Sequence, residues 1–233
     1  MRSIAEYIDH TNLKPEADEL AVDRLAEEAA THGFAAVCVN GRFVARAASA
    51  LRGTGVAVCA VVGFPLGAMK PMARNIEATS ACKDGATEID FVAHLPHLLK
   101  EDIAALRTEM RELVRTVRSV NPEVVVKAIL ETAVLLREVD PATARRRIEA
   151  GCVAARESGC DFVKTSTGFH PAGGATLEAV RLLKACAGPM RVKAAGGIRT
   201  RHDAGLMIEA GAARLGCSAG VAIVREQGAD AHQ

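Results

Sequence analysis

Short runs rich in apolar and β-branched residues alternate with longer amphipathic stretches along the whole chain. The runs that we interpret as strands cover residues 6–9, 35–40, 56–63, 88–93, 124–130, 161–165, 191–195 and 213–217. Helical spacing marks the stretches 17–32, 42–52, 71–84, 98–119, 141–158, 174–187 and 200–210, and a last short helix near Ser218. About eight linkerless βα units predict an α/β fold, a single (β/α)8 TIM barrel domain over residues 1–233. A doubly wound open sheet is the alternative, because the first strand is weak.

The composition suits one such domain and argues against several classes of partner. With 233 residues, 49% of them hydrophobic, the chain can bury one substantial core. A formal net charge of +1 gives no sign of nucleic acid or an acidic membrane as partner. No apolar run approaches the ~20 residues that span a membrane, and the first residues do not resemble a signal peptide. The seven cysteines lack a C-x-x-C pair and lie mostly in apolar runs, which indicates a reducing, cytoplasmic environment.

Charged residues interrupt four of the predicted strands. In residues 88–92, Asp90 alternates with apolar neighbours and should point into the barrel. Lys127, Lys164 and Lys193 each follow apolar residues in a separate strand. An unpaired buried charge loses several kcal/mol of solvation, so such groups pair with one another or do chemistry. A structural ion network, or lysines that point outward, is one interpretation, and a catalytic site is the other.

The catalytic interpretation rests on the chemistry of lysine. A lysine is nucleophilic only when neutral, and its ordinary pKa is ~10.4. Burial and a neighbouring cation both lower the pKa of a lysine. Lys164 and Lys193 end adjacent predicted strands, so one can form an imine while the other acts as the neighbouring cation and proton relay. Asp90 offers a carboxylate for moving protons.

Glycine-rich turns follow the last two predicted strands, at residues 195–200 and 215–220. In TIM barrels these loops commonly bind phosphate through backbone N–H groups. Glycine lets the backbone approach the anion closely, and Ser218 adds a hydroxyl donor. Thr167 and Gly168 can contribute from the preceding loop, and Arg199 either contacts the phosphate or is a solvated residue at a helix start.

Histidines give little support to a metal site. His94 and His97 are a close pair, but Pro96 argues against a helical metal site and no carboxylate stands at ligand spacing in the sequence. We therefore expect no metal. We expect His10 to be part of a hydrogen-bonded structure, and Asp9 to orient a lysine or cap the next segment.

Motifs along nearly the whole chain carry a family resemblance. They cover residues 8–11 with 13–15, 37–40, 62–67, 88–90, 127–132, 162–168, 193–200 and 216–218. Through these motifs the chain resembles the deoxyribose-phosphate aldolase family. The resemblance implies reversible cleavage of 2-deoxy-D-ribose 5-phosphate, a small phosphorylated aldehyde, to acetaldehyde and glyceraldehyde 3-phosphate. It also implies that no metal or organic cofactor is used, and that the chain forms a homodimer.

The resemblance assigns roles to individual positions. It implies that Lys164 forms the imine and that Asp90 and Lys193 transfer protons. It places five residues in the substrate pocket: Asp9, Thr11, Cys38, Lys127 and Thr167. It places seven residues at the phosphate: Gly168, Gly196, Gly197, Ile198, Arg199, Gly216 and Ser218.

Some positions depart from the family pattern. Ala194 stands where proline is usual, Ala219 stands where a second serine often follows Ser218, and the loop 169–174 is one residue longer than usual. Residues 92–97, with both histidines, replace a Val-Ile-Asn-x-Gly stretch. These changes concern the phosphate end and leave the imine chemistry untouched.

Two other functions stay open: a Schiff-base aldolase for another aldehyde or ketone phosphate, and a non-catalytic barrel whose lysines only bind anions.

Overall fold

The alternating runs close into a barrel in the computed structural model, which describes residues 3–137 and 139–226. Its parallel strands are hydrogen-bonded in chain order, and β8 pairs back to β1. The strands are β1 (Ile8–Asn12), β2 (Ala36–Asn40), β3 (Ala57–Val62), β4 (Glu88–Val92), β5 (Val125–Ile129), β6 (Phe162–Lys164), β7 (Arg191–Ala195) and β8 (Arg214–Cys217). The predicted (β/α)8 barrel is confirmed, and the closed ring excludes the open sheet.

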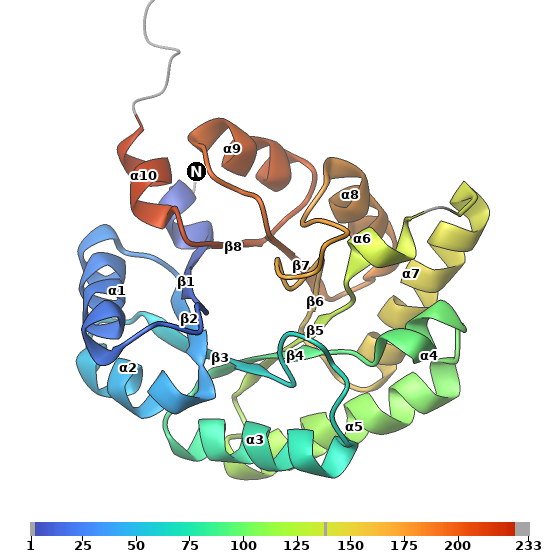
Figure 1. Cartoon of the computed structure of the whole chain (residues 1–233), viewed down its shortest axis with the longest axis horizontal. Coiled ribbons are helices and arrows are strands. Elements are labelled where there is room, and N and C mark those ends of the chain that lie inside the picture. The colour runs from blue at the N-terminus through green and yellow to red at the C-terminus, as the bar shows by residue number, and fades with distance from the viewer. Residues whose placement is uncertain (1–2, 138, 227–233) are drawn as a thin grey trace, which may run out of the picture.

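Helices surround this ring on its outside (Figure 1). They are α1 (Glu19–His32), α2 (Val44–Ala50), α3 (Pro71–Lys83), α4 (Leu95–Leu99), α5 (Ile103–Val120), α6 (Thr132–Leu135), α7 (Pro141–Glu157), α8 (Leu177–Cys186), α9 (Arg201–Glu209) and α10 (Gly220–Arg225). Two 3-10 helices, η1 (Ile4–Tyr7) and η2 (Gly41–Phe43), precede β1 and α2. None of the helices in the described ranges is long and apolar enough to cross a membrane.

Capping side chains set where several helices begin. Asp18, Asp102 and Thr176 each accept a hydrogen bond from a backbone N–H in the first turn of α1, α5 and α8. These bonds satisfy donors that the first turn of a helix leaves without partners. The predicted helices at 17–32 and 174–187 therefore start later than expected, at Glu19 and Leu177.

Two other predicted boundaries are wrong. The first strand covers Ile8–Asn12 rather than residues 6–9, because it carries the polar residues Asp9 and Thr11. The predicted helix 98–119 is two helices, α4 and α5, which are separated at Glu101, where φ is +56°, and at the cap Asp102. The short helix α6 was not predicted.

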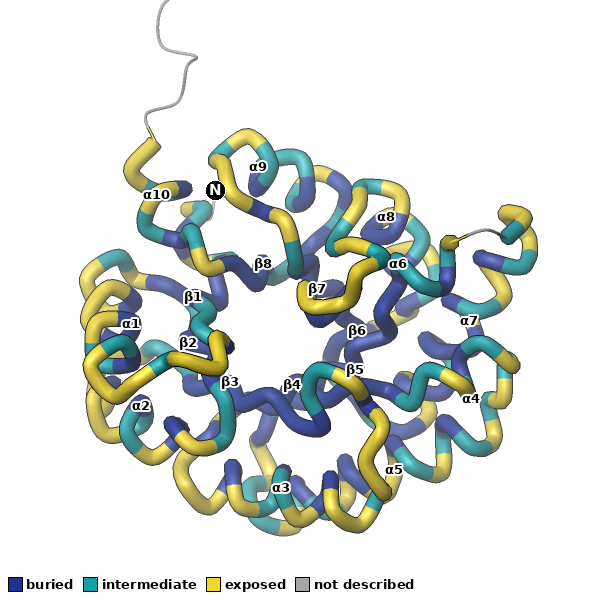
Figure 2. Tube along the Cα trace, in the orientation of Figure 1, coloured by how far each residue is buried: buried dark blue, intermediate teal, exposed yellow. Residues whose placement is uncertain are grey.

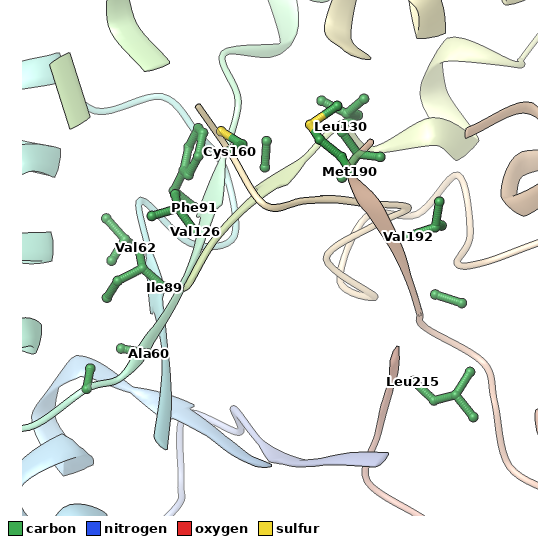
Figure 3. Packing of buried hydrophobic residues seen from close by; sticks show 14 of the residues in the cluster. Ala60, Val62, Ile89, Phe91, Val126, Leu130, Cys160, Met190, Val192 and Leu215 are labelled. Atoms are coloured by element: carbon green, nitrogen blue, oxygen red, sulfur yellow. The ribbon is translucent and has the colours of Figure 1, made fainter. Parts of the chain in front are cut away.

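The two faces of each strand have different neighbours. Outward-facing residues such as Ile89, Phe91, Val126 and Val192 are fully buried and pack in one large hydrophobic cluster with the helices (Figure 3). Figure 2 shows the strands as buried and the outer turns of the helices as exposed. All seven cysteines are free, and only Cys186 is not fully buried. Because the outward-facing side chains already form a hydrophobic core with the helices, the inward-facing side chains can be polar.

Candidate active site

Three lysines converge on one buried carboxylate inside the barrel. Oδ2 of Asp90 accepts hydrogen bonds from Lys164 Nζ at 2.9 Å and from Lys193 Nζ at 2.7 Å. Oδ1 accepts from Lys127 Nζ at 2.8 Å and from Cys59 Sγ at 3.1 Å. Strand register produces this meeting, because Asp90 is paired with Lys127 and Lys164 is paired with Lys193. The interior ions therefore pair with one another, and none of these lysines points outward.

A further set of charges neutralises the same lysines. Lys193 Nζ lies 2.5 Å from Asp9 Oδ2, and Lys127 Nζ lies 2.6 Å from Glu88 Oε2. Arg214 joins the two carboxylates, since its guanidinium donates to both Asp9 and Glu88. The expectation that Asp9 orients a lysine agrees with this contact. We predicted no role for Glu88 or Arg214, although alternation places them on the same faces as Asp90 and Gly216.

The network holds more positive than negative groups. Four cations (Lys127, Lys164, Lys193 and Arg214) face three carboxylates (Asp9, Glu88 and Asp90), so the fully charged set has one positive charge in excess. Within the described part of the chain, Lys127 and Lys193 each contact two carboxylates, whereas Lys164 contacts only Asp90. Lys164 is thus the lysine of the three with the fewest carboxylate contacts.

The lysines and carboxylates shift one another's protonation. Burial by itself would raise the pKa of the Asp90 carboxyl, but the three lysines outweigh it and hold this pKa well below its usual value. The pKa of Asp9 is lowered in the same way, because Lys193 and Arg214 outweigh burial. Burial would lower the pKa of Lys193, yet Asp9 and Asp90 raise it well above the ordinary value. Lys193 is therefore the cation of the lysine pair.

A cavity of about 490 Å³ opens above this network. Lys164 lines it, together with Thr11 and Thr167. The other three residues predicted for the substrate pocket, Asp9, Cys38 and Lys127, are at most 1% exposed and lie beneath it. Asp90 and Lys193 are also fully buried. Of the charged interior residues, Lys164 is the one that a ligand in the cavity can reach.

The residues predicted to bind phosphate gather at one end of the same cavity. All seven line it: Gly168, Gly196, Gly197, Ile198, Arg199, Gly216 and Ser218. Lys14 and Arg24 line it as well and were not predicted. Lys14 lies in a motif that the resemblance used, whereas Arg24 lies on α1, where nothing in the sequence distinguishes it from a solvated helical arginine.

Close backbone packing shapes this end of the cavity. A Cβ on Gly174 would lie 2.3 Å from the carbonyl oxygen of Gly196, and one on Gly196 would lie 2.9 Å from Gly174 Cα. Gly196 also has a φ of +92°, which favours glycine. The loops after β6 and β7 can meet at this distance only because both positions lack side chains.

Glu131 is another polar residue that sequence reasoning missed. It is 4% exposed, has a φ of +52°, and accepts a hydrogen bond of 2.6 Å from Thr167 Oγ1. Its carboxylate thereby fixes Thr167, which lines the cavity. The sequence feature that could have indicated Glu131 was its position at the polar end of the predicted fifth strand.

His10 makes the expected hydrogen bond, with 2.7 Å between its Nε2 and Glu28 Oε2.

The structure gives His94 and His97 surroundings that the sequence did not indicate. His94 caps the start of α4 and His97 lies within it, with ring centroids 4.5 Å apart, and Pro96 occupies the first turn of this helix without separating them. A carboxylate that the local sequence did not offer comes from α5, where Glu109 Oε1 lies 3.4 Å from His97 Nε2. Spacing in the sequence did not indicate Glu109, because the packing of α5 against α4 is what brings it beside His97.

Comparison with known proteins gives concordant results. The model of the DeoC/LacD family of aldolases matches residues 3–227. A deoxyribose-phosphate aldolase of Thermoanaerobacter sp. (strain X514) is 48% identical over 96% of this chain and 96% of its own. One from Bacillus subtilis (strain 168) is 43% identical over 97% of each chain. Among solved structures, the tetrameric deoxyribose phosphate aldolase from Aeropyrum pernix is 33% identical, with a TM-score of 0.85 over 95% of this chain and 89% of that one.

Proposed function

The chain belongs to the DeoC/LacD family of aldolases, and we propose that it reversibly cleaves 2-deoxy-D-ribose 5-phosphate to acetaldehyde and D-glyceraldehyde 3-phosphate. It is a carbon–carbon lyase. One observation supports the Schiff-base chemistry above all others. Lys164 lines the cavity, and its amine contacts the buried Asp90, which also accepts from the buried Lys193.

Formation of the imine requires a neutral amine at Lys164. We assign the imine to Lys164 because it lines the cavity and, among the three lysines of the described chain, has the fewest carboxylate contacts. Neutral Lys164 attacks C1 of the open-chain sugar, and the carbinolamine then loses water to give a protonated imine. This cation withdraws electrons from the C2–C3 bond.

Cleavage follows from proton transfer at the sugar. A base removes the proton from the C3 hydroxyl, the C2–C3 bond breaks, and its electron pair forms an enamine on Lys164 while glyceraldehyde 3-phosphate leaves. Protonation of the enamine at C2 and hydrolysis then release acetaldehyde. We assign these proton transfers to Asp90 with Lys193. Both are fully buried, so the protons move between Asp90 and the sugar through a water molecule.

The phosphate occupies the glycine-lined end of the cavity in this proposal. Backbone N–H groups near Gly168, Gly196 and Gly197 can donate to it, and Ser218 adds a hydroxyl. The loop after β7 continues to Thr200, which caps α9, so a helix N-terminus begins close to this end. Arg199 supplies a cation on the same loop.

An assay of products tests the proposal. Purified protein given 2-deoxy-D-ribose 5-phosphate should release acetaldehyde and glyceraldehyde 3-phosphate in equal amounts. Donors and acceptors tested separately in the synthetic direction should show acetaldehyde as the donor. Use of a ketone donor in its place would point to an aldolase of another specificity.

Assembly and location belong to the same proposal. α3 and the loop before it expose large apolar side chains, with Leu66 at 77%, Met72 at 69% and Ile76 at 63%. These residues support a homodimer, which light scattering coupled to gel filtration can test. A Met72→Glu variant should have a smaller molar mass in solution than the parent.

The free, mostly buried cysteines support a reducing, cytoplasmic setting.

A further inference from the structure

A cluster of metal-ligating side chains lies outside the catalytic network. It consists of His94, His97 and Glu109, each of which offers one ligand atom, and these atoms lie within 4.8 Å of one another. His94 lies in the loop after β4 and caps α4, His97 belongs to α4 and Glu109 comes from α5, so two helices and the loop after β4 contribute. Nothing in the proposed aldolase chemistry uses any of these side chains.

The distances suit a small transition-metal ion. Zn²⁺ lies about 2.0–2.2 Å from nitrogen and oxygen ligands, so a tetrahedral site separates its ligand atoms by about 3.4 Å. His97 Nε2 and Glu109 Oε1 already lie 3.4 Å apart. Nδ1 of His94 is buried and has no hydrogen-bond partner among the described residues.

A buried arginine orients one of these ligands. Arg74, which is 2% exposed, donates to Glu109 Oε2 at 3.3 Å and to the Glu109 carbonyl at 3.1 Å. This pairing occupies one carboxylate oxygen and turns the other, Oε1, toward His97. His97 Nδ1 lies 3.9 Å from Asp102 Oδ2, which is beyond hydrogen-bond distance, so this carboxylate adds negative charge near the ring without fixing its orientation.

We propose that His94, His97 and Glu109 bind one divalent transition-metal ion, with Zn²⁺ as the reference ligand and water as the fourth. Two imidazoles and one carboxylate match the ligand type that such ions prefer over the all-oxygen sites of Mg²⁺ and Ca²⁺. The ion would tie the end of β4 to α4 and α5. Its role is structural, because Asp90 contacts its lysine partners and Cys59, and none of the three ligands.

Cobalt substitution gives a direct test on the full-length, chelator-treated protein. One equivalent of Co²⁺ should produce the intense visible absorption of a tetrahedral site with nitrogen and oxygen ligands, and Zn²⁺ should displace it. His94→Gln and His97→Gln should each weaken Zn²⁺ binding about tenfold or more, as loss of ligand-shell groups does elsewhere. His202→Gln, an exposed histidine on α9, is the matched control and should bind as the parent does.

Stability provides a second readout. Zn²⁺ at 100 times its dissociation constant should raise the melting temperature by about 5 °C or more, and the double variant His94→Gln/His97→Gln should lose this rise. Glu109→Gln should also weaken binding, with Glu112→Gln on the same helix as its control. Equal Zn²⁺ affinity in the parent and the double variant would overturn the proposal. A sulfur-to-cobalt charge-transfer band would overturn it as well, because it would place the ion at the buried Cys38, Cys59 and Asp90.

Discussion

Lys164 donates from β6 to Asp90 on β4, with 2.9 Å between its Nζ and Oδ2 of the carboxylate. The same oxygen accepts from Lys193 at 2.7 Å. One carboxylate therefore binds both Lys164, which lines the cavity, and Lys193, which does not. When Lys164 condenses with a carbonyl, Asp90 and Lys193 remain paired directly behind the new imine.

Replacement of Asp90 by asparagine tests the proton-transfer role. We expect Asp90→Asn to lower kcat by about 10²-fold or more, since a positioned acid–base group contributes at least that much. KM should change little, because Asp90 is fully buried and does not line the cavity. Steady-state kinetics measures both. Asp23→Asn, in an exposed pair with Arg46, is the control, and a kcat within a few-fold of the parent for Asp90→Asn would refute the assignment.

Acid should weaken the fold through Asp9 and Asp90. Both carboxyls have pKa values below the ordinary value in the folded protein. Such groups stabilise the fold above their unfolded pKa of ~3.9, and this contribution disappears as the pH falls through the lower folded values. The raised pKa of Lys193 acts at the other end, where its contribution persists below ~10.4 and disappears as the pH rises through the folded value.

Urea midpoints across pH measure these contributions. They should be nearly constant from about pH 5 to pH 9 and should fall below about pH 4. The acid decrease should be smaller in Asp90→Asn than in the parent. An equal decrease in both proteins would show that Asp90 carries no folding-linked charge.

Arg214 should matter for stability although it lies away from the cavity. It is the cation that joins Asp9 and Glu88, so Arg214→Met leaves both carboxylates with one partner fewer. We expect a loss of about 3 kcal/mol or more in the free energy of unfolding, as for other broken buried pairs. Arg191→Met removes an exposed arginine that stacks on Phe162 with 4.2 Å from its guanidinium carbon to the ring centroid, and should cost about 1 kcal/mol or less. Denaturant unfolding measures both free energies. An equal loss in the two variants would show that Arg214 does not stabilise the fold through the interior network.

Gly196→Ala should damage the phosphate end selectively. A methyl group there would lie 2.9 Å from Gly174 Cα and 3.1 Å from Gly168 Cα, so the two loops must move apart. We expect KM for 2-deoxy-D-ribose 5-phosphate to rise about tenfold or more, while kcat/KM for unphosphorylated 2-deoxyribose changes less. Gly197→Ala carries a similar positive φ but no contact within 4 Å, and should have the smaller effect. An identical fall in kcat/KM for the phosphorylated and the unphosphorylated sugar would indicate general damage to the barrel.

The alternation of strand and helix runs was enough to predict the barrel, and side-chain alternation in residues 88–92 predicted that Asp90 points inward. The direction of the three lysines stayed open in the sequence, and the contacts with Asp90 show that they point inward. Side-chain alternation also places Glu88 and Arg214 inside; Glu88 lies in the motif at residues 88–90, but the resemblance assigned it no role, and Arg214 lies in no motif. The start of β1 was misplaced because Asp9 and Thr11 belong to the polar interior and make that strand resemble a loop. Glu109 and the histidine pair could not be joined from the sequence, since their approach depends on the turn between α4 and α5.

Covalent trapping on Lys164 tests the Schiff-base chemistry most directly. The protein is incubated with acetaldehyde, reduced with borohydride, digested and mapped by mass spectrometry. We expect an ethyl group on Lys164 of the parent protein and no trapped adduct in Lys164→Leu, which should also be inactive. An unmodified Lys164 in the parent, or trapping on another lysine that persists in Lys164→Leu, would contradict the chemistry proposed for this site.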